Sequence, residues 1–424
     1  MGIYLGDTKV TGTGVQIDNS MSSTSTHAVT NAAITEALSE VGYTEWKKPT
    51  DWIDIQGAAL QNSIYFLVAH SAPVESGGTY TVATYPQLKV QTTVSSSGTY
   101  DVYVDGVKVA TTASATVTTL DWGALYTAGT IVGGFNVTHP SALTTHVVRI
   151  TPTTGTNTMT AIQLDSSISE YGILWIHFQI ANAISLNTFS GSYSYNYKCA
   201  LLEAVTSQND ELQILTGFHF KSANSLQHLP LLIGNNTTID CARGLNGCTS
   251  LKKIRLKNTK FLGNQGLANS GIEVVETDNA YILCNNYTLS GCDKLKKLPP
   301  FIFEGQISGT DFVVVGSELE PTFVDASSGS SLKGLTMNGI SSTNRADGIK
   351  GVIVSSSAPF NNSSSPQLNV SYTGMDRAAL VALFNSLPTV SASQVCNITG
   401  CTGAADLTAE DIAIAVNKGW SVTR

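Results

Sequence analysis

The residue types that usually carry catalysis are present in the sequence, but they fall into no catalytic spacing. The seven histidines form no HxxxH or HExxH pair, and GxSxG, phosphate-loop and strand-linked GxGxxG motifs are absent. Asp51 and Asp54 flank Trp52, and a carboxylate pair beside an aromatic ring could serve glycan hydrolysis. Both carboxylates lie in a linker-like phrase, which favours solvated surface residues. We therefore expect no enzymatic activity and no cofactor.

The cysteines are the remaining candidates for chemistry. Their number is odd, no two form a CxxC pair, and the spacing of two of them follows an internal repeat. This pattern favours small buried core residues over metal ligands or disulfides, so we expect no metal site. The seven are Cys199, Cys241, Cys248, Cys284, Cys292, Cys396 and Cys401.

Short, imperfect repeats between about residues 174 and 354 organise the chain. Residues 247–254 read GCTSLKKI and residues 291–298 read GCDKLKKL. Equivalent aliphatic positions recur at gaps of 25, 21, 23 and 37 residues, and the last gap predicts a degenerate copy or an inserted loop. The first three gaps match leucine-rich solenoids, whose repeats run to roughly 20–29 residues. The predicted solenoid core is Leu226, Leu251, Ile254, Ile272, Leu295, Leu298 and Leu332.

Each repeat predicts a short strand preceded by a tight turn. The Gly-Cys step suits such a turn followed by a small buried residue. In the best copy Leu251, Ile254 and Leu256 would point inward, and the lysines between them would remain in solvent. One copy cannot bury its apolar edge alone, so neighbouring copies must stack.

The two GC-containing phrases resemble BspA-type leucine-rich repeats, which occur in surface proteins of gut bacteria and in fibre proteins of their phages. Residues 383–388 (LFNSLP), 399–408 (TGCTGAADLT) and 411–415 (DIAIA) closely resemble the C-terminus of repeat-bearing tail proteins in phages of gut Bacteroidetes, crAss-like phages among the candidates. Residues 25–34 (STHAVTNAAI) resemble a segment that recurs in tail-fibre proteins, with departures at His27 and Thr30. The resemblance implies a virion appendage protein that recognises a host surface.

Composition agrees with a β-rich or fibrous protein. Charged residues are only 13% of the chain, and the net charge is −8 without a long basic run, which argues against a nucleic-acid groove. No apolar run is long enough to span a bilayer. The first residues lack a charged and an apolar segment of the kind a signal peptide has. We therefore expect assembly in a host cytoplasm and localisation to a virion.

The N-terminal residues predict attachment and oligomerisation. Residues 1–25 are polar and read as a virion attachment arm. Residues 26–42 read as a short helix with 3-4 spacing, in which an asparagine occupies a register-setting position of a coiled coil. An amphipathic helix packed on its own chain is the alternative. The seam residues are Asn31, Ile34, Leu38 and Val41, and a homotrimer is favoured.

Residues 60–165 read as all-β. Tyr100, Val102 and Val104 alternate with polar residues, and Asp105-Gly106 between two such runs is a strong hairpin signal. Many short strands in about 100 residues suggest an immunoglobulin-like sandwich, acting as a spacer or binding a ligand itself. The strand candidates are residues 64–69, 80–84, 88–94, 100–104, 107–111, 131–137, 146–151 and 159–164.

The last 50 residues predict helices in place of the repeats. Residues 375–387 read as an amphipathic helix stopped by Pro388, and Thr408 caps a second helix over residues 409–418 that stops at Gly419. A strand is predicted at 397–399. Such a helical cap protects the open end of a solenoid.

Together these features predict a mainly β protein in five parts. They are an attachment arm (1–25), an oligomerising helix and linker (26–58), an Ig-like β-sandwich (59–165), a leucine-rich-repeat solenoid (166–374) and a helical cap (375–424). Expected partners are further copies of the chain, other virion tail proteins, and a host-surface glycan or protein. Nucleic acid and membrane insertion are not expected. A collar, baseplate or head-fibre decoration protein and a bacterial BspA-like adhesin are the alternatives.

Overall fold

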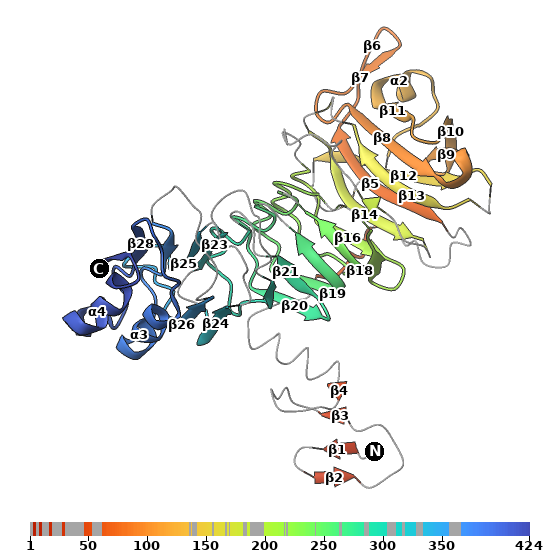
Figure 1. The fold of residues 1–424 in the computed structure, drawn as a ribbon. Coiled ribbons are helices and arrows are strands. Elements are labelled where there is room, and N and C mark those ends of the chain that lie inside the picture. The colour runs from red at the N-terminus through yellow and green to blue at the C-terminus, as the bar shows by residue number, and fades with distance from the viewer. Residues whose placement is uncertain are drawn as a thin grey trace. The chain divides into compact units, whose positions relative to one another are not determined.

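The chain divides into two compact units, Met1–Pro49 and Thr50–Arg424. Figure 1 shows the fold. The computed structural model describes residues 3–5, 8–10, 17–18, 28–29, 46–52, 62–134, 137, 142–154, 157–165, 168, 170–180, 185–186, 199–215, 217, 219–241, 243–262, 265–283, 288–302, 311–315, 319–327, 334–355 and 366–424. Over this part the protein is mainly β, with several sheets and few helices.

The first unit contains four short strands. The antiparallel pair is β1 (Ile3–Leu5) and β2 (Thr8–Val10), and the parallel pair is β3 (Ile17–Asp18) and β4 (Ala28–Val29). The sequence places Ala28 and Val29 at the start of a helix, whereas they form β4; valine is β-branched and suits a strand. The predicted seam residues lie outside the described part, so the seam stays a prediction.

The second unit begins with a two-sheet region, residues 62–186. Its six-stranded sheet has the order β10-β9-β12-β5-β14-β16, which includes one strand of the next region, and its four-stranded sheet has the order β11-β8-β13-β15. The strands of the two sheets are β5 (Ser63–Ser71), β8 (Gln87–Val94), β9 (Thr99–Val104), β10 (Val107–Ala113), β11 (Val117–Asp121), β12 (Leu143–Pro152), β13 (Met159–Leu164), β14 (Ile173–Gln179), β15 (Ser185–Leu186) and β16 (Ala204–Ser207). Strands β6 (Val74–Ser76) and β7 (Thr79–Thr81) form a separate antiparallel pair.

Alternate residues of these strands build the core. On β8 the side chains of Leu88, Val90 and Val94 are buried while their neighbours are half-buried, as expected for a strand with one face inward. Seven of the eight predicted strands overlap observed ones, and β13 has the predicted bounds. The prediction for residues 131–137 is wrong, because Gly133 takes a left-handed conformation (φ +60°) and no described residue of that segment is in a strand.

Two short helical elements also belong to this region. The 3-10 helix η1 spans Ser95–Ser97. The α-helix α2 (Trp122–Thr127) begins at Asp121, whose side chain accepts a hydrogen bond from the Ala124 amide. Helix α2 is too short to show a helical period, so the sequence pattern did not predict it.

Strand β14 joins the two-sheet region to a parallel-strand region, residues 199–424. It is antiparallel to β5 and parallel to β16, so the antiparallel pairing of the two-sheet region ends at β14 and the parallel pairing begins there. The sequence assigned residues 173–180 to the repeats alone. Sheet β17-β18-β19-β21-β22, with β20 also paired to β19, continues in parallel through β17 (Glu211–Gln213), β18 (Leu231–Asp240), β19 (Lys253–Leu262), β20 (Val274–Asp278), β21 (Tyr281–Leu283) and β22 (Phe301–Ile302).

Successive strand-and-turn segments of this region, called coils below, are joined at a similar chain spacing. Main-chain hydrogen bonds of 2.7 to 3.0 Å link residues 21 to 24 positions apart. The bonded amide–carbonyl pairs are Gln227–Glu203, Glu273–Lys252, Lys296–Glu273 and Glu320–Lys296. The last pair shows that the 37-residue gap contains a coil of ordinary length, in which Leu319 is buried. Leu332 lies outside the described residues.

The Gly-Cys step recurs with the same geometry in three coils. Gly247, Gly291 and Gly400 all have φ between +70° and +76°, a conformation that favours glycine. The following cysteines are buried, and their thiols donate to carbonyls of the preceding coil: Cys248 to Phe220 at 3.1 Å, Cys292 to Leu267 at 3.0 Å, and Cys401 to Val370 at 3.0 Å. The turn and the small side chain therefore set how closely neighbouring coils stack.

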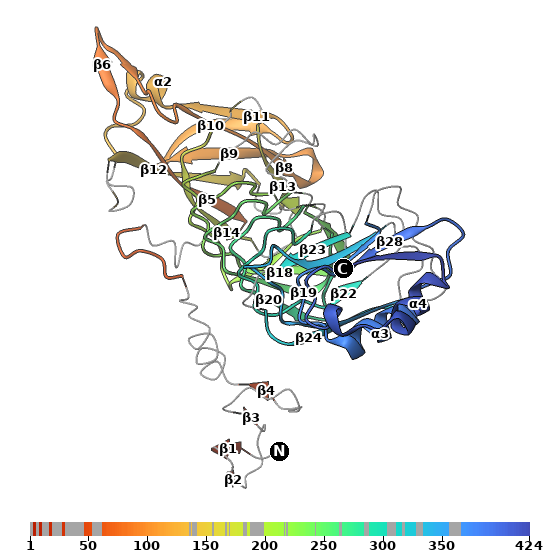
Figure 2. The ribbon, with the colours of Figure 1, turned by 90° about the vertical axis from the view of Figure 1, so that its left-hand side faces the viewer.

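The described C-terminal end has two further parallel sheets, β23-β25-β27-β28-β29 and β24-β26, with two α-helices and one 3-10 helix. Its elements are β23 (Asp311–Val315), β24 (Thr322–Ala326), β25 (Leu335–Gly339), β26 (Ile349–Val354), β27 (Leu368–Asn369), α3 (Arg377–Ser386), β28 (Gln394–Asn397), η2 (Ala404–Asp406), α4 (Ala409–Val416) and β29 (Trp420–Thr423). Both views place α3 and α4 side by side (Figure 1; Figure 2). The strand predicted at 397–399 is instead β28, and β29 follows it.

Helix α4 begins where the sequence predicts, with Thr408 and Asp411 forming a capping box, and it ends at Val416, two residues before the predicted end. Helix α3 begins at Arg377, two residues after the predicted start, because Asp376 caps it. The ion pair Arg377–Asp411 (2.8 Å) joins the helices, and hydrogen bonds from Arg377 and the Thr408 amide outweigh partial burial to lower the pKa of Asp411 to about 2.

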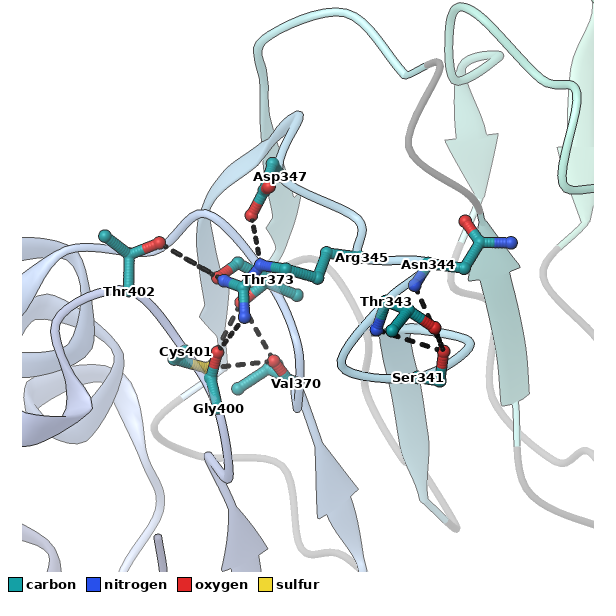
Figure 3. Close-up of polar contacts among 10 residues, drawn as sticks. All are labelled: Ser341, Thr343, Asn344, Arg345, Asp347, Val370, Thr373, Gly400, Cys401 and Thr402. Carbon is teal, nitrogen blue, oxygen red and sulfur yellow. Dashed lines mark hydrogen bonds and ion pairs between the residues drawn. The ribbon is translucent and has the colours of Figure 1, made fainter.

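Arg345 ties three coils together at this end (Figure 3). Its guanidinium donates to the carbonyl of Thr373 at 3.0 Å and to the carbonyl of Gly400 at 2.5 Å. It also pairs with Asp347 of its own coil at 2.8 Å. One side chain thus links main-chain groups far apart in sequence.

Candidate recognition face

Strand β19 presents a charged outer face because its residues alternate. Ile254 and Leu256 are buried, whereas Lys253, Arg255 and Lys257 lie on the opposite side and are half-buried. Parallel sheets covered on both faces have near-continuous apolar strands, so this alternation marks a sheet with one face open to solvent. We call the outward residues Asp210, Lys253, Arg255, Lys257, Glu276 and Asp278, together with the buried His228 that is bonded to Asp210, the recognition face.

Opposite charges on this face meet across the strand ladder. Arg255 lies opposite Glu276 and Lys257 opposite Asp278 in the register of β19 with β20. Lys257 pairs with Asp278 at 3.1 Å, and Lys253 pairs with Glu276 at 2.5 Å. The pairs link consecutive coils, so they hold these long side chains in defined positions.

Asp210 is the acidic centre of the neighbouring coil. It accepts hydrogen bonds from Nε2 of His228 at 2.9 Å and from the guanidinium of Arg255. Burial alone would raise the pKa of Asp210, but these hydrogen bonds, from His228 and then Arg255, lower it below its usual value. The carboxylate therefore remains charged well into the acid range.

A second charge ladder lies at the start of the strands. Glu273 pairs with Lys252 at 3.3 Å and with Lys296 at 3.0 Å, so one carboxylate bridges the coils before and after it. The bridge follows from the repeated Leu-Lys-Lys phrase, which places a lysine at the same position of two coils.

The thiols of this region are not reactive nucleophiles. Burial raises the pKa of the thiols of Cys199 and Cys248 to about 12 and of Cys292 to about 11, so these sulfurs stay protonated. Within the part of the chain that the structure describes, no group of three His, Cys, Asp or Glu side chains could hold a metal ion. All six described cysteines are buried free thiols.

The predicted solenoid core residues are placed as follows. Leu226, Leu251, Ile254, Ile272 and Leu295 are buried, and Leu298 is half-buried against the same core. Four aromatic residues of the repeats, Tyr281, Tyr287, Phe301 and Phe303, are of a type that could stack on a sugar or anchor a partner. Tyr281 is 40% exposed and Phe301 begins β22, whereas Tyr287, Phe303 and Asp54 lie outside the described residues. Trp52 is buried, with its ring 5.7 Å from that of Trp175.

Sequence reasoning missed the acidic half of the recognition face. Glu276 and Asp278 lie 21 residues after Arg255 and Lys257, which is the spacing of one repeat. Opposite charges at the repeat distance were therefore a usable signal, because the repeat places such residues side by side.

Comparison with known proteins finds no matching family model, curated protein or solved structure. Of the helices in the described residues, none has the length and apolar character needed to cross a membrane.

Proposed function

We propose that this chain is a non-enzymatic phage virion appendage protein, similar to a tail fibre, that adsorbs to a host surface. The observation that carries the proposal is the recognition face, an ordered set of ion-paired side chains on the open side of stacked parallel strands. It is supported by the resemblance of residues 247–254, 291–298 and 399–408 to repeat-bearing tail proteins.

In this proposal the parallel-strand region is a leucine-rich solenoid and the two-sheet region an immunoglobulin-like sandwich. In-register parallel strands joined every 21 to 24 residues support the solenoid. Mostly antiparallel strands with alternating burial in two sheets support the sandwich. Helices α3 and α4 would then be the terminal cap that covers an otherwise open core.

The ion-paired face suits recognition of a polar surface. Side chains already held by partners lose little freedom when a ligand binds, so less of the binding free energy is spent on ordering them. A broad face shares its contacts among many residues, and host glycans or proteins are its proposed ligands. The N-terminal residues would attach the chain to other virion tail proteins, and Asn31, Ile34, Leu38 and Val41 would join copies into a trimer.

Cell binding with the labelled full-length chain tests this function. The chain should bind cells of at least one strain in a panel of gut Bacteroidetes, as measured by flow cytometry, without releasing oligosaccharides from their polysaccharide. Release of oligosaccharides would make the protein an enzyme. Absence of binding across strains adsorbed by a phage carrying this chain would contradict a role in adsorption.

A further inference from the structure

A row of aromatic and cationic side chains crosses the six-stranded sheet of the two-sheet region. In the strand register Tyr103 of β9 lies opposite Arg149 of β12, and Arg149 lies opposite Tyr65 of β5. The row continues to His177 of β14. Directly opposite residues on one face of a sheet are within contact distance, so these four side chains form one continuous strip.

Arg149 has no acidic partner among the described residues. Its guanidinium carbon lies 3.9 Å from the centre of the Tyr103 ring, and its Nε is buried without a hydrogen-bond partner. Its two terminal nitrogens are not buried, and among the described residues Arg149 makes no ion pair or side-chain hydrogen bond. In a chain of net charge −8 this half-buried cation is therefore left with open donors.

The neighbouring carboxylate of Asp101 already has partners. Asp101 pairs with Lys108 at 2.7 Å and accepts a hydrogen bond from Thr111 at 2.6 Å, so it does not neutralise Arg149. Tyr103 is oriented toward the same carboxylate, with its hydroxyl 3.4 Å from Asp101. The positive charge of the row thus stays unopposed beside a fixed aromatic ring.

The other end of the row is rigid. Nδ1 of His177 is bonded to Thr206 at 2.8 Å and Nε2 to Gln179 at 3.1 Å. Between His177 and Arg149 lies Tyr65, whose ring is buried; its hydroxyl is open and has no hydrogen-bond partner among the described residues. Arg149 and Tyr65 therefore offer adjacent unused donors beside the Tyr103 ring.

We propose that the Tyr103–Arg149–Tyr65 row is a binding site for an acidic carbohydrate, with the guanidinium holding a sugar carboxylate. The fork of a guanidinium matches the two oxygens of a carboxylate. Aromatic side chains supply flat apolar area for the ring of a pyranose and a hydroxyl for its polar edge. The site lies apart from the recognition face and does not depend on the proposed function.

The placement favours a sugar over an acidic peptide. Extended peptides bind sheets by adding a strand at an edge, where main-chain groups are unpaired. This row lies across the interior strands β9, β12 and β5, whose main chains are already paired on both sides. A flat ring can lie across such a face, whereas a peptide finds no free main-chain partner there.

Calorimetric titration of the full-length chain tests the site with two matched tetrasaccharides, β-1,4-linked tetraglucuronate and cellotetraose. They share the same backbone and differ in the carboxylate. We expect tetraglucuronate to bind at least tenfold more tightly than cellotetraose. Arg149→Gln should weaken tetraglucuronate binding at least tenfold, and Arg149→Lys less, because a lysine keeps the charge but loses the fork.

Arg424→Gln is the control, because it removes one exposed positive charge outside the two-sheet region; binding should change less than twofold. Thermal melting of each variant checks that the fold is intact. Three results would overturn the proposal: no binding of tetraglucuronate at millimolar concentration, equal binding by wild type and Arg149→Gln, or equally tight binding of an octaglutamate peptide.

Discussion

Replacing Arg345 by methionine measures how strongly one side chain holds successive coils together. The change keeps the aliphatic stem but removes donors to the Thr373 and Gly400 carbonyls and the pair with Asp347. A hydrogen bond from a charged donor contributes about 1.5–3 kcal/mol, and the lower end applies because the Arg345 side chain is 26% exposed. The exposed pair with Asp347 adds less than about 1 kcal/mol. We expect a local loss of about 3 kcal/mol.

Hydrogen exchange followed by mass spectrometry is the suitable assay, because a chain with several regions need not unfold in one step. Since 1.4 kcal/mol corresponds to a factor of ten, protection of the coil-to-coil amides of Ala346, Tyr372 and Thr402 should fall about 10²-fold. Arg424→Met is the control, since that exposed guanidinium makes no ion pair or side-chain hydrogen bond with the described residues. A change below threefold, or an equal change in the two-sheet region, would refute the reasoning.

Three further predictions concern the core and its titrating groups. Leu251→Asp should cost more than about 4 kcal/mol by burying a charge, and limited proteolysis should show damage in residues 200–354 that spares the two-sheet region, whereas Leu251→Met should be tolerated. Burial and nearby His146 lower the pKa of His70 from 6.5 despite a bond to the Ser71 carbonyl. The unfolded chain therefore binds this proton more readily, so the melting temperature should fall as pH drops below about 6.5, and His70→Phe should flatten that dependence. A thiol reagent should leave the six buried cysteines unmodified in the native chain and label all seven in denaturant; rapid native labelling of several would contradict their burial.

The sequence was most informative where a local signal decides the structure. Asp105-Gly106 takes positive φ at both residues, as the predicted tight hairpin requires. Thr408 begins α4 because its side chain and main chain complete the capping box. The repeats were recognised because the Gly-Cys step recurs in the sequence, and the structure places a left-handed glycine and a buried cysteine at that step.

The features that the sequence did not predict lack such a local signal. The coil ending at Leu319 lacks the Gly-Cys phrase, so only its hydrogen bond to the preceding coil reveals it. The Tyr103–Arg149–Tyr65 row depends on strand register between residues 46 and 84 positions apart, for which a single sequence offers no signal. The recognition face was only partly predicted. Its acidic residues lie one repeat spacing after the basic residues, and this signal was present in the sequence but not used.

The most direct test of the account is to remove charge from the recognition face and measure cell binding. Lys253→Gln, Arg255→Gln and Lys257→Gln combined should reduce binding of the labelled full-length chain to a susceptible strain at least tenfold. The same number of cations removed elsewhere, by Lys108→Gln, Lys350→Gln and Arg424→Gln combined, should change binding less than twofold. Equal binding by the two triple variants, both folded by melting analysis, would contradict recognition through this face.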